Sequence, residues 1–464
     1  MGISSDSTVV GVIVAIYYLG CSVGAVLASW YADKYGRKKS IFACLAITTL
    51  GNLFMFTSGL GFHKGALVMM MVGRVVMGLG VGGIDAVVPT YSSELSESDA
   101  RGKALAQEFQ MNIFGLNMAF GINLGVTVGL GKDSQVFPVL LMALIELLPE
   151  SPRFLVMHDR TDDAKASLKR IYGRTDDDAK QKERLEELQK AHENEGASRI
   201  AYTDMFSPVH QQFHPTMVVV MGQVNQALTG YGAVSVYGPQ IFELLGYAVR
   251  VAEYLTQANY LSYLLFMTLA WLLIDAVGRR ALMLVNSAGL TGSFVLLCVF
   301  GGLASRADQL GIPRQAVAIP GVVTLFVATV NFGVGWLATV WLVPTEIFPT
   351  SCRSKGAAVS VVIWGVMNFA VTLVTPILFN GAKYWLFLVF AATNLFAGLW
   401  TFLYLPETGN RSFEENQKFF EEAKEAGTWR VSKVARGEYR KLPNIEDEAT
   451  GETQPLLRRV QDQI

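Results

Sequence analysis

Long apolar runs dominate this sequence of 464 residues and constrain its fold more than any other feature. A helix needs about 20 apolar residues to cross roughly 30 Å of hydrocarbon. Ten runs reach this length, and an eleventh has only 14 residues. The sequence therefore predicts an all-α polytopic membrane protein with about eleven transmembrane helices, at 9–31, 41–62, 65–88, 104–130, 135–148, 216–242, 252–274, 281–304, 317–343, 357–380 and 384–405.

The charged residues are concentrated outside these runs. Residues 150–215 and 407–464 hold 46 of the 77 Asp, Glu, Lys and Arg residues. The other 340 residues hold 31, about one in eleven, whereas a soluble domain has roughly one in four. The balance of 38 basic and 39 acidic residues also excludes a nucleic-acid binder, which needs a basic surplus. No nucleophile–base pair, metal cluster or cofactor loop is found, so we expect no enzyme, no metal site and no cofactor.

The distribution of runs and charges divides the chain into four parts. We expect a first helix bundle at 1–148, a cytoplasmic linker with surface helices at 149–215, a second six-helix bundle at 216–406 and a cytoplasmic tail at 407–464. In this orientation the short inside loops hold ten Lys and Arg residues and the outside loops hold six, as the positive-inside rule requires.

Three sequence features recur in the same order in the two bundles. The pattern D-x-x-G-R-[KR] occurs twice, 242 residues apart, and a glutamate seven residues before an arginine occurs twice, 252 residues apart. PESPR at 149–153 and PET at 406–408 close the two halves. Such repeats indicate two homologous halves, as in repeat-built transporters. The repeated residues are Asp33, Gly36 and Arg37, Asp275, Gly278 and Arg279, Glu94 and Arg101, and Glu346 and Arg353.

These repeated charges predict a gating network at the inside face. The acid of one motif can pair with the arginine of the other, and breaking such a network would let the halves rock apart. The alternative is that the arginines only obey the positive-inside rule. That alternative explains the arginines but not the repeated glycines and glutamates.

The same motifs carry a family resemblance. The chain resembles the sugar porter family of the major facilitator superfamily, most of all its fungal members, over about residues 9–420. The resemblance implies two six-helix bundles with one sugar or polyol site between them, and alternating access by uniport or proton symport. A complete member has one more helix before residue 9, so we expect that the first helix is lacking. The matching strings include DKYGRKK (33–39), GRVVMGLGVGG (73–83), PTYSSE (89–94), YGPQIFE (237–243), DAVGRR (275–280), PTEIFPTSCR (344–353) and PETGNRSFEE (406–415).

The resemblance also implies which residues bind the solute. The family's polar and aromatic site positions fall on Gln226, Trp341 and Asn368, with Gln110 one residue out of register. At other site positions this chain differs from the family. The usual amides are replaced by Phe109, Ala227, Gly232 and Trp364. A sugar's hydroxyls need paired donors and acceptors, so a less hydroxylated or partly apolar solute fits better than a standard hexose.

Asp85 is the most deeply placed acid of the apolar runs. An acid inside a membrane span is costly and usually faces a cavity or a partner. Asp85 is therefore either a solute ligand or proton-titrating acid, or an acid satisfied by a neighbouring helix.

We expect a multi-pass carrier of a monosaccharide, polyol or related small polar solute, embedded in a lipid bilayer, with H+ as an additional partner if transport is a symport. Two alternatives stay open: a non-transporting sugar sensor and a non-functional truncated carrier. The plasma membrane is the expected location. A vacuolar or endosomal membrane is the alternative, because Glu452 with Leu456 and Leu457 resembles a sorting signal.

Overall fold

The computed structural model describes most of both predicted bundles. The described residues are 7–58, 65–95, 101–129, 155–156, 160–172, 182, 185–186, 189, 200–349, 352–409, 411 and 413–431. Within these ranges the secondary structure is helical and contains no strand. The predicted short span at 135–148 lies outside the described residues.

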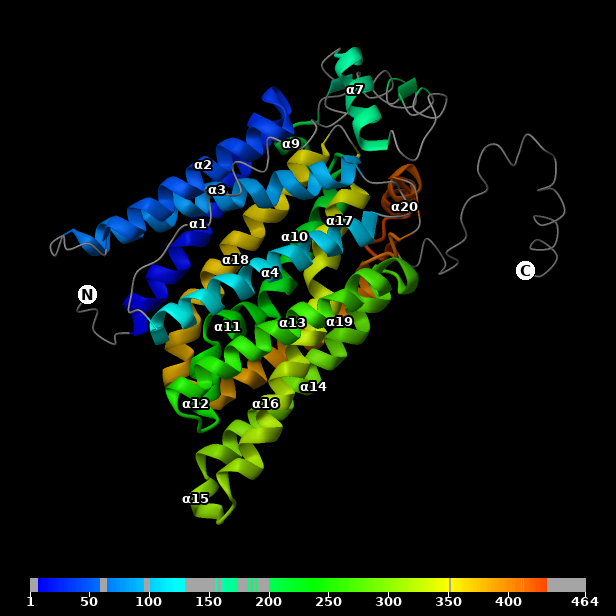
Figure 1. Cartoon of the computed structure of the whole chain (residues 1–464). Coiled ribbons are helices and arrows are strands. Elements are labelled where there is room, and N and C mark those ends of the chain that lie inside the picture. Colours follow the sequence, from blue (N-terminus) through cyan, green and yellow to red (C-terminus); the bar gives the residue numbers. More distant parts are fainter. Residues whose placement is uncertain are drawn as a thin grey trace, which may run out of the picture.

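In the described part of the first half there are four long helices (Figure 1). They are α1 (Ser7–Tyr35), α2 (Arg37–Ser58), α3 (Ala66–Leu95) and α4 (Arg101–Gly129).

The second half is built from longer and shorter helices in the order α10 (Phe213–Leu228), α11 (Tyr231–Val236), α12 (Gly238–Leu244), α13 (Val249–Val277), α14 (Arg279–Ser305), α16 (Arg314–Asn331), η1 (Phe332–Leu337), α17 (Ala338–Ile347), α18 (Arg353–Ala382) and α19 (Leu386–Tyr404). Short peripheral helices are α7 (Thr161–Tyr172), α9 (Tyr202–Met205), α15 (Ala307–Leu310), η2 (Lys383–Trp385) and α20 (Phe413–Glu425).

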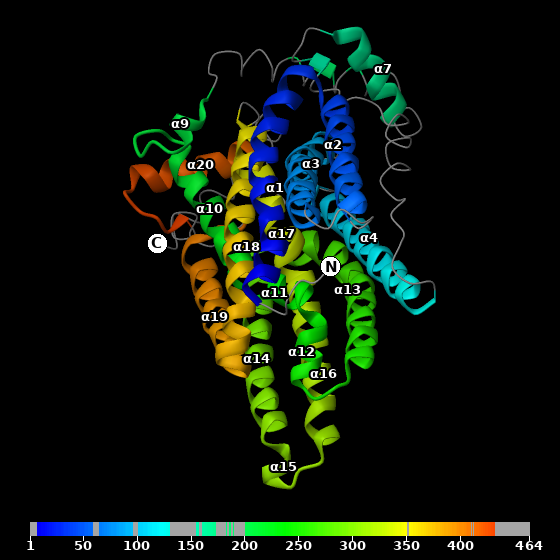
Figure 2. The ribbon, with the colours of Figure 1, turned by 90° about the vertical axis from the view of Figure 1, so that its left-hand side faces the viewer.

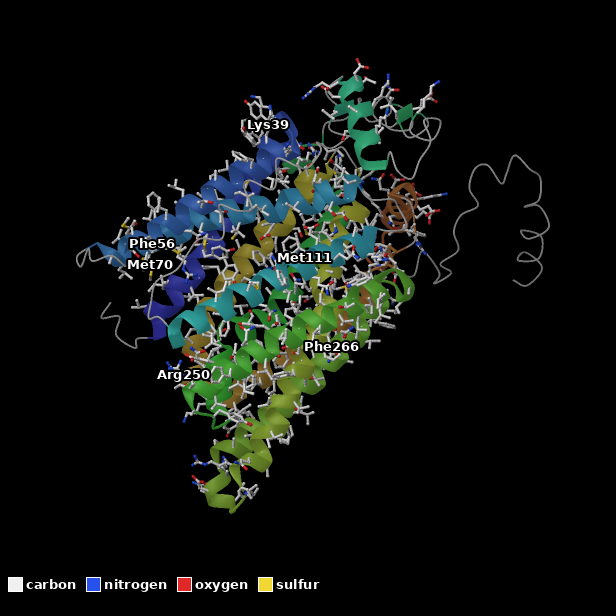
Figure 3. The ribbon with its side chains drawn as sticks, viewed as in Figure 1. Lys39, Phe56, Met70, Met111, Arg250 and Phe266 are labelled. Carbon is white, nitrogen blue, oxygen red and sulfur yellow. The ribbon has the colours of Figure 1, made fainter. Side chains whose placement is uncertain are left out.

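The outer surface of the helices is apolar along most of its length. Seven helical stretches of the described residues are long and apolar enough to cross a membrane. Phe56, Met111 and Phe266 are among the exposed large apolar side chains of α2, α4 and α13 (Figure 3). The charged Lys39 and Arg250 lie toward opposite ends of the molecule. An apolar belt between charged ends is what a lipid bilayer requires of a spanning protein.

Glycines in the string at 73–83 bring α3 against α1 and α2. A Cβ at Gly78 or Gly82 would lie 2.2 Å from the carbonyl oxygen of Tyr17 or 2.1 Å from that of Cys21, both in α1. A Cβ at Gly80 would lie 2.4 Å from the carbonyl oxygen of Cys44 in α2. The small residues therefore allow close backbone contact between membrane helices.

The predicted single span at 216–242 is wrong in detail, because the structure breaks it into α10, α11 and α12. Gly230 follows α10 with a φ of 80°, and a Cβ there would lie 2.4 Å from Cγ of Phe390. The left-handed backbone favours glycine at this position. The span at 317–343 is also irregular, since the π-helix η1 separates α16 from α17.

Two seams join the halves. Along one seam α1 packs against α18, and along the other α4 packs against α13 (Figure 2). The second seam contains hydrogen bonds from Asn117 Nδ2 to the carbonyl oxygen of Tyr260, at 2.8 Å, and from Gln257 Nε2 to Asn117 Oδ1, at 3.2 Å. Helices that are equivalent in the two repeats are α1 and α13, α2 and α14, and α4 and α18.

The beginning of the tail is ordered against the second half. The first part of the predicted tail contains α20, whose Phe420 ring lies 5.3 Å from the ring of His214 at the start of α10. The His214 ring also lies 4.7 Å from that of Trp429. The helices α7, α9 and α20 all lie toward one end of the molecule (Figure 2). We call this the inside end, after the orientation predicted from the sequence.

Candidate functional site

The first D-x-x-G-R motif turns the chain from α1 into α2 and holds a buried ion pair. Gly36 has a φ of 106°, which favours glycine at the turn. The next residue, Arg37, has a side chain that is only 4% exposed. It donates to the Ala32 carbonyl oxygen and to Glu94 Oε1, both at 3.0 Å, and lies 3.3 Å from Asp33 Oδ1. This pair ties the end of α3 to the α1–α2 turn.

The second motif repeats this arrangement between α13 and α14. Gly278 has a φ of 95°, and Arg279 follows with a side chain that is 2% exposed. Arg279 donates to the Ile274 carbonyl oxygen at 3.0 Å and to Glu346 Oε1 at 2.7 Å, and lies 2.9 Å from Asp275 Oδ1. The structure thus places the glutamate of each half beside the arginine of the D-x-x-G-R motif in the same half.

The start of α18 in the second half packs on the motif of the first half. Ser29 Oγ donates to the Ser354 carbonyl oxygen at 2.9 Å, and Arg37 Nη2 lies 3.5 Å from Ser354 Oγ. The preceding Arg353 is buried and donates to the Phe348 carbonyl oxygen at 3.4 Å. Sequence reasoning missed Ser354, although it follows one of the repeated arginines.

The start of α4 in the first half packs on the motif of the second half. The backbone N–H of Lys103 donates to Asp275 Oδ2 at 2.8 Å. A Cβ at Gly102 would lie 2.2 Å from Asp275 Oδ1, so the helices approach closely. The side chain of Arg101 lies outside the described residues. We call the two motifs and their cross-contacts the inside latch, made of Asp33, Arg37, Glu94, Gly102, Lys103, Asp275, Arg279, Glu346 and Ser354.

The PET segment after α19 completes the latch in the second half. Glu407 accepts hydrogen bonds from the backbone N–H groups of Arg279 and Arg280, at 2.8 and 3.0 Å. Thr408 Oγ1 donates to Glu346 Oε2 at 2.5 Å. The repeat of PESPR and PET marked this segment in the sequence, but not the partners of its side chains.

The end of the linker also reaches the latch. Lys355 Nζ donates to the Ile200 carbonyl oxygen at 2.5 Å and lies 5.9 Å from the ring centroid of Tyr202 in α9. Burial raises the pKa of the Tyr202 hydroxyl, which interacts with Ser29 and Asp33 of α1. The segment therefore contacts both halves at the inside end.

Deeper in the molecule, four aromatic rings form a row that runs from α1 through α18 and α17 to α4. Tyr18 of α1 lies 5.3 Å from Trp364 of α18, measured between ring centroids. Trp364 lies 5.8 Å from Trp341 of α17, and Trp341 lies 5.9 Å from Phe109 of α4. Two rings come from each half, so the row connects the two halves.

Two predicted site amides lie in α10 and α18 of the second half. Gln226 Nε2 donates to the carbonyl oxygens of Trp336 and Leu337, at 3.2 and 3.4 Å. Asn368 Nδ2 donates to the carbonyl oxygen of Trp364 at 2.9 Å. The buried Oε1 of Gln226 has no hydrogen-bond partner among the described residues.

Gln110 does not join the ring row. Its Nε2 donates to Thr268 Oγ1 at 3.0 Å and to the Leu264 carbonyl oxygen at 3.4 Å, both in α13. Consecutive helix residues point about 100° apart, so Phe109 contacts Trp341 while Gln110 contacts the seam.

Asp85 is half-buried in α3 and receives no hydrogen bond or ion pair from the described residues. It lies close enough to Tyr17 and Cys21 of α1 and to Glu108 of α4 to interact electrostatically. Glu108 lines an open cavity of about 510 Å³ between α3 and α4. Arg74 of α3, which was not predicted from the sequence, interacts electrostatically with Tyr17 and Tyr18 of α1.

This arrangement defines a class of protein. Two homologous helix bundles, a duplicated latch at one end and a mixed aromatic and amide centre form a membrane carrier of the major facilitator type. The described residues contain no group of three or more His, Cys, Asp or Glu placed to hold a metal ion.

Comparison with known families identifies the chain further. Residues 3–420 match the family described as "Sugar (and other) transporter". The chain belongs to this family and is a transporter rather than an enzyme. The fold class and the resemblance predicted from the sequence are thereby confirmed.

Relatives of known description agree. The chain is 30% identical over 421 residues to the MFS-type transporter oryC of Aspergillus oryzae, covering 88% of this chain and 76% of that protein. It is 28% identical over 442 residues to the sugar transporter STL1 of Saccharomyces cerevisiae, covering 92% and 75%. The structure of the proton:xylose symporter XylE bound to 6-bromo-6-deoxy-D-glucose has the same fold, with a TM-score of 0.76, 20% identity and coverage of 90% and 91%.

Proposed function

We propose that this protein carries a sugar, polyol or related small polar solute across a membrane by alternating access. The duplicated inside latch is the observation that carries the proposal. Each half holds three buried or half-buried charges in the latch, and contacts of Ser354 and Lys103 join the halves beside them. Nothing in a static channel requires such a repeat. The family membership and the relatives described as sugar transporters point to the same solute class.

The geometry supports a simple cycle. With the latch formed, the two halves are held together at the inside end. Breaking the contacts of Ser354 with α1 and α2, and of Asp275 with α4, frees the halves to rock about the seams. The solute then leaves the centre around Gln226, Trp341 and Asn368 toward the inside.

We place the carrier in the plasma membrane and leave facilitated transport and proton symport as the two coupling modes. A fluorescent fusion distinguishes the plasma membrane from vacuolar or endosomal membranes. A protonophore that abolishes accumulation of the solute would identify symport.

Uptake in a yeast strain without its own sugar and polyol carriers tests the proposal. We expect saturable uptake of labelled glucose, glycerol or myo-inositol above an empty-vector control. A Glu346→Gln variant should reach the membrane but transport slowly, because it weakens the latch pair with Arg279. Normal surface expression without uptake of any of these solutes would contradict the proposal and favour the sensor or the non-functional carrier.

A further inference from the structure

The ring row and the amides beside it restrict which solute the centre can accept. The row consists of Tyr18, Trp364, Trp341 and Phe109, and Trp341 is in contact with both of its neighbours. The resemblance to sugar porters places amides at the positions of Phe109 and Trp364. Both departures contact Trp341, one from each half.

Gln226 presents an acceptor to a solute, because its nitrogen contacts two backbone carbonyl oxygens, whereas Asn368 presents an acceptor and one remaining N–H. A backbone carbonyl oxygen only accepts hydrogen bonds, so the amide nitrogens of Gln226 and Asn368 must face the carbonyl oxygens they contact. The side-chain oxygens then remain for a ligand. Gly232 has no side chain in front of Asn368, and a Cβ there would lie 2.9 Å from Asn368 Oδ1.

A bare hexose fits such a centre poorly. Each of its hydroxyls both donates and accepts, and a hydroxyl that loses its acceptor role on burial costs affinity. An aromatic group offers a flat apolar face that packs against aromatic rings in offset or edge-to-face geometry. A solute with such a group and a few donating hydroxyls would contact both the aromatic row and the amide oxygens.

We propose that the central site selects a hydroxylated solute that carries an aromatic group, such as an aryl glycoside, with Phe109 and Trp364 as specificity-determining residues. This inference rests on the proposed transport function and specifies its solute class. The aromatic group packs against Trp341 between Phe109 and Trp364. Hydroxyls of the solute donate to Gln226 Oε1 and Asn368 Oδ1.

Two glucosides with the same free hydroxyls test the proposal. Methyl β-D-glucopyranoside and phenyl β-D-glucopyranoside differ only in the group on the anomeric oxygen. Binding of each to the purified full chain is measured by calorimetry, and labelled uptake is measured in proteoliposomes. We expect the phenyl compound to bind about tenfold more tightly, because its ring packs on the aromatic row.

Variants then assign the preference to the row. Trp364→Asn and Phe109→Gln should each reduce the preference to about twofold or less, whereas Trp364→Phe should keep most of it. Trp385→Asn is the matched control, because Trp385 is 56% exposed and lies outside the row. It should leave the preference unchanged.

The outcomes separate the two proposals. Equal binding of both glucosides, with uptake of either, would overturn the aromatic preference and leave sugar transport standing. Binding and uptake of neither compound, nor of free glucose, glycerol or myo-inositol, would overturn both. A preference for the phenyl compound that survives Trp364→Asn and Phe109→Gln would show that the aromatic group binds elsewhere.

Discussion

Arg37 and Arg279 occupy equivalent positions in the two halves and make equivalent contacts. Each donates to the carbonyl oxygen five residues earlier, at 3.0 Å, and each pairs with a glutamate at the end of the next long helical segment. Each also lies beside the aspartate of its own motif. The repetition of a whole contact set, and not only of a residue pattern, indicates a shared mechanical role for the two turns.

Replacing Arg279 by alanine should strongly destabilise the protein. The change leaves Glu346 buried without its charge partner, and removing one member of a buried pair costs about 3–5 kcal/mol. Reversible unfolding in detergent micelles measures the free energy of unfolding. Arg250→Ala is the matched control, because Arg250 is 55% exposed and pairs with Glu253. Its effect should stay within about 0.5 kcal/mol, and an equally small effect of Arg279→Ala would mean that the pair is not structural.

Gly102→Leu should open the inside end. The added side chain starts 2.2 Å from Asp275 Oδ1, and overpacking of this kind costs about 1–3 kcal/mol. A Thr90→Cys reporter, in a background without the four native cysteines, is buried beside the latch. Its labelling by a maleimide from the inside should rise about tenfold, the change expected for roughly 1.4 kcal/mol.

Gly115→Leu on the same helix is the control for this experiment. A Cβ at Gly115 meets nothing within 4 Å, so labelling at position 90 should not change. Equal labelling of the two leucine variants would show that α4 does not hold the inside end closed.

The transmembrane spans and the ion pairs of the latch could be predicted from the sequence, and the reasons are physical. Hydrocarbon thickness fixes the length of an apolar run, and repeated acids and arginines fix which residues can pair. The cross-contacts of Ser354 and Gly102 were not readable, because they depend on how two separate halves are placed. The ring row was missed for a similar reason, since Trp341 was predicted as a site residue but its neighbours in α4 and α18 are far away in sequence.

The breaks and irregular turns within the helices were also not predicted from the sequence. The apolar run at 216–242 is continuous, and hydropathy alone does not report the turn at Gly230. The Thr-Gly-Tyr-Gly string at 229–232 is the signal that could have indicated it, because closely spaced glycines weaken a helix.

Gly230→Ala should destabilise the second half more than Gly246→Ala does. Both glycines have a positive φ, of 80° and 99°, so both substitutions carry backbone strain of about 1–2 kcal/mol. Only at Gly230 does the new Cβ also meet a ring, 2.4 Å from Cγ of Phe390. Thermal unfolding of the two variants in the same detergent isolates the clash. An equal loss of thermal stability in the two variants would mean that Phe390 moves aside at no cost in free energy.

Asp85→Asn should slow transport without lowering stability. No described residue gives Asp85 a hydrogen bond or an ion pair, so its carboxylate is not a structural partner, and an unpaired acid in a span is costly to keep. The ionisable groups facing it are Tyr17 and Cys21 from α1 and Glu108 from α4. Such an acid is retained when it takes up a proton or contacts the solute. Initial uptake rates between pH 5 and pH 8 should therefore depend less on pH in the variant, because asparagine cannot titrate.

Glu253→Gln is the control, as Glu253 is half-buried and lies near the start of α13 beside Arg250. A variant with the normal rate and the normal pH profile would show that Asp85 serves neither the proton nor the solute, while a loss of thermal stability would show that it has a structural partner after all.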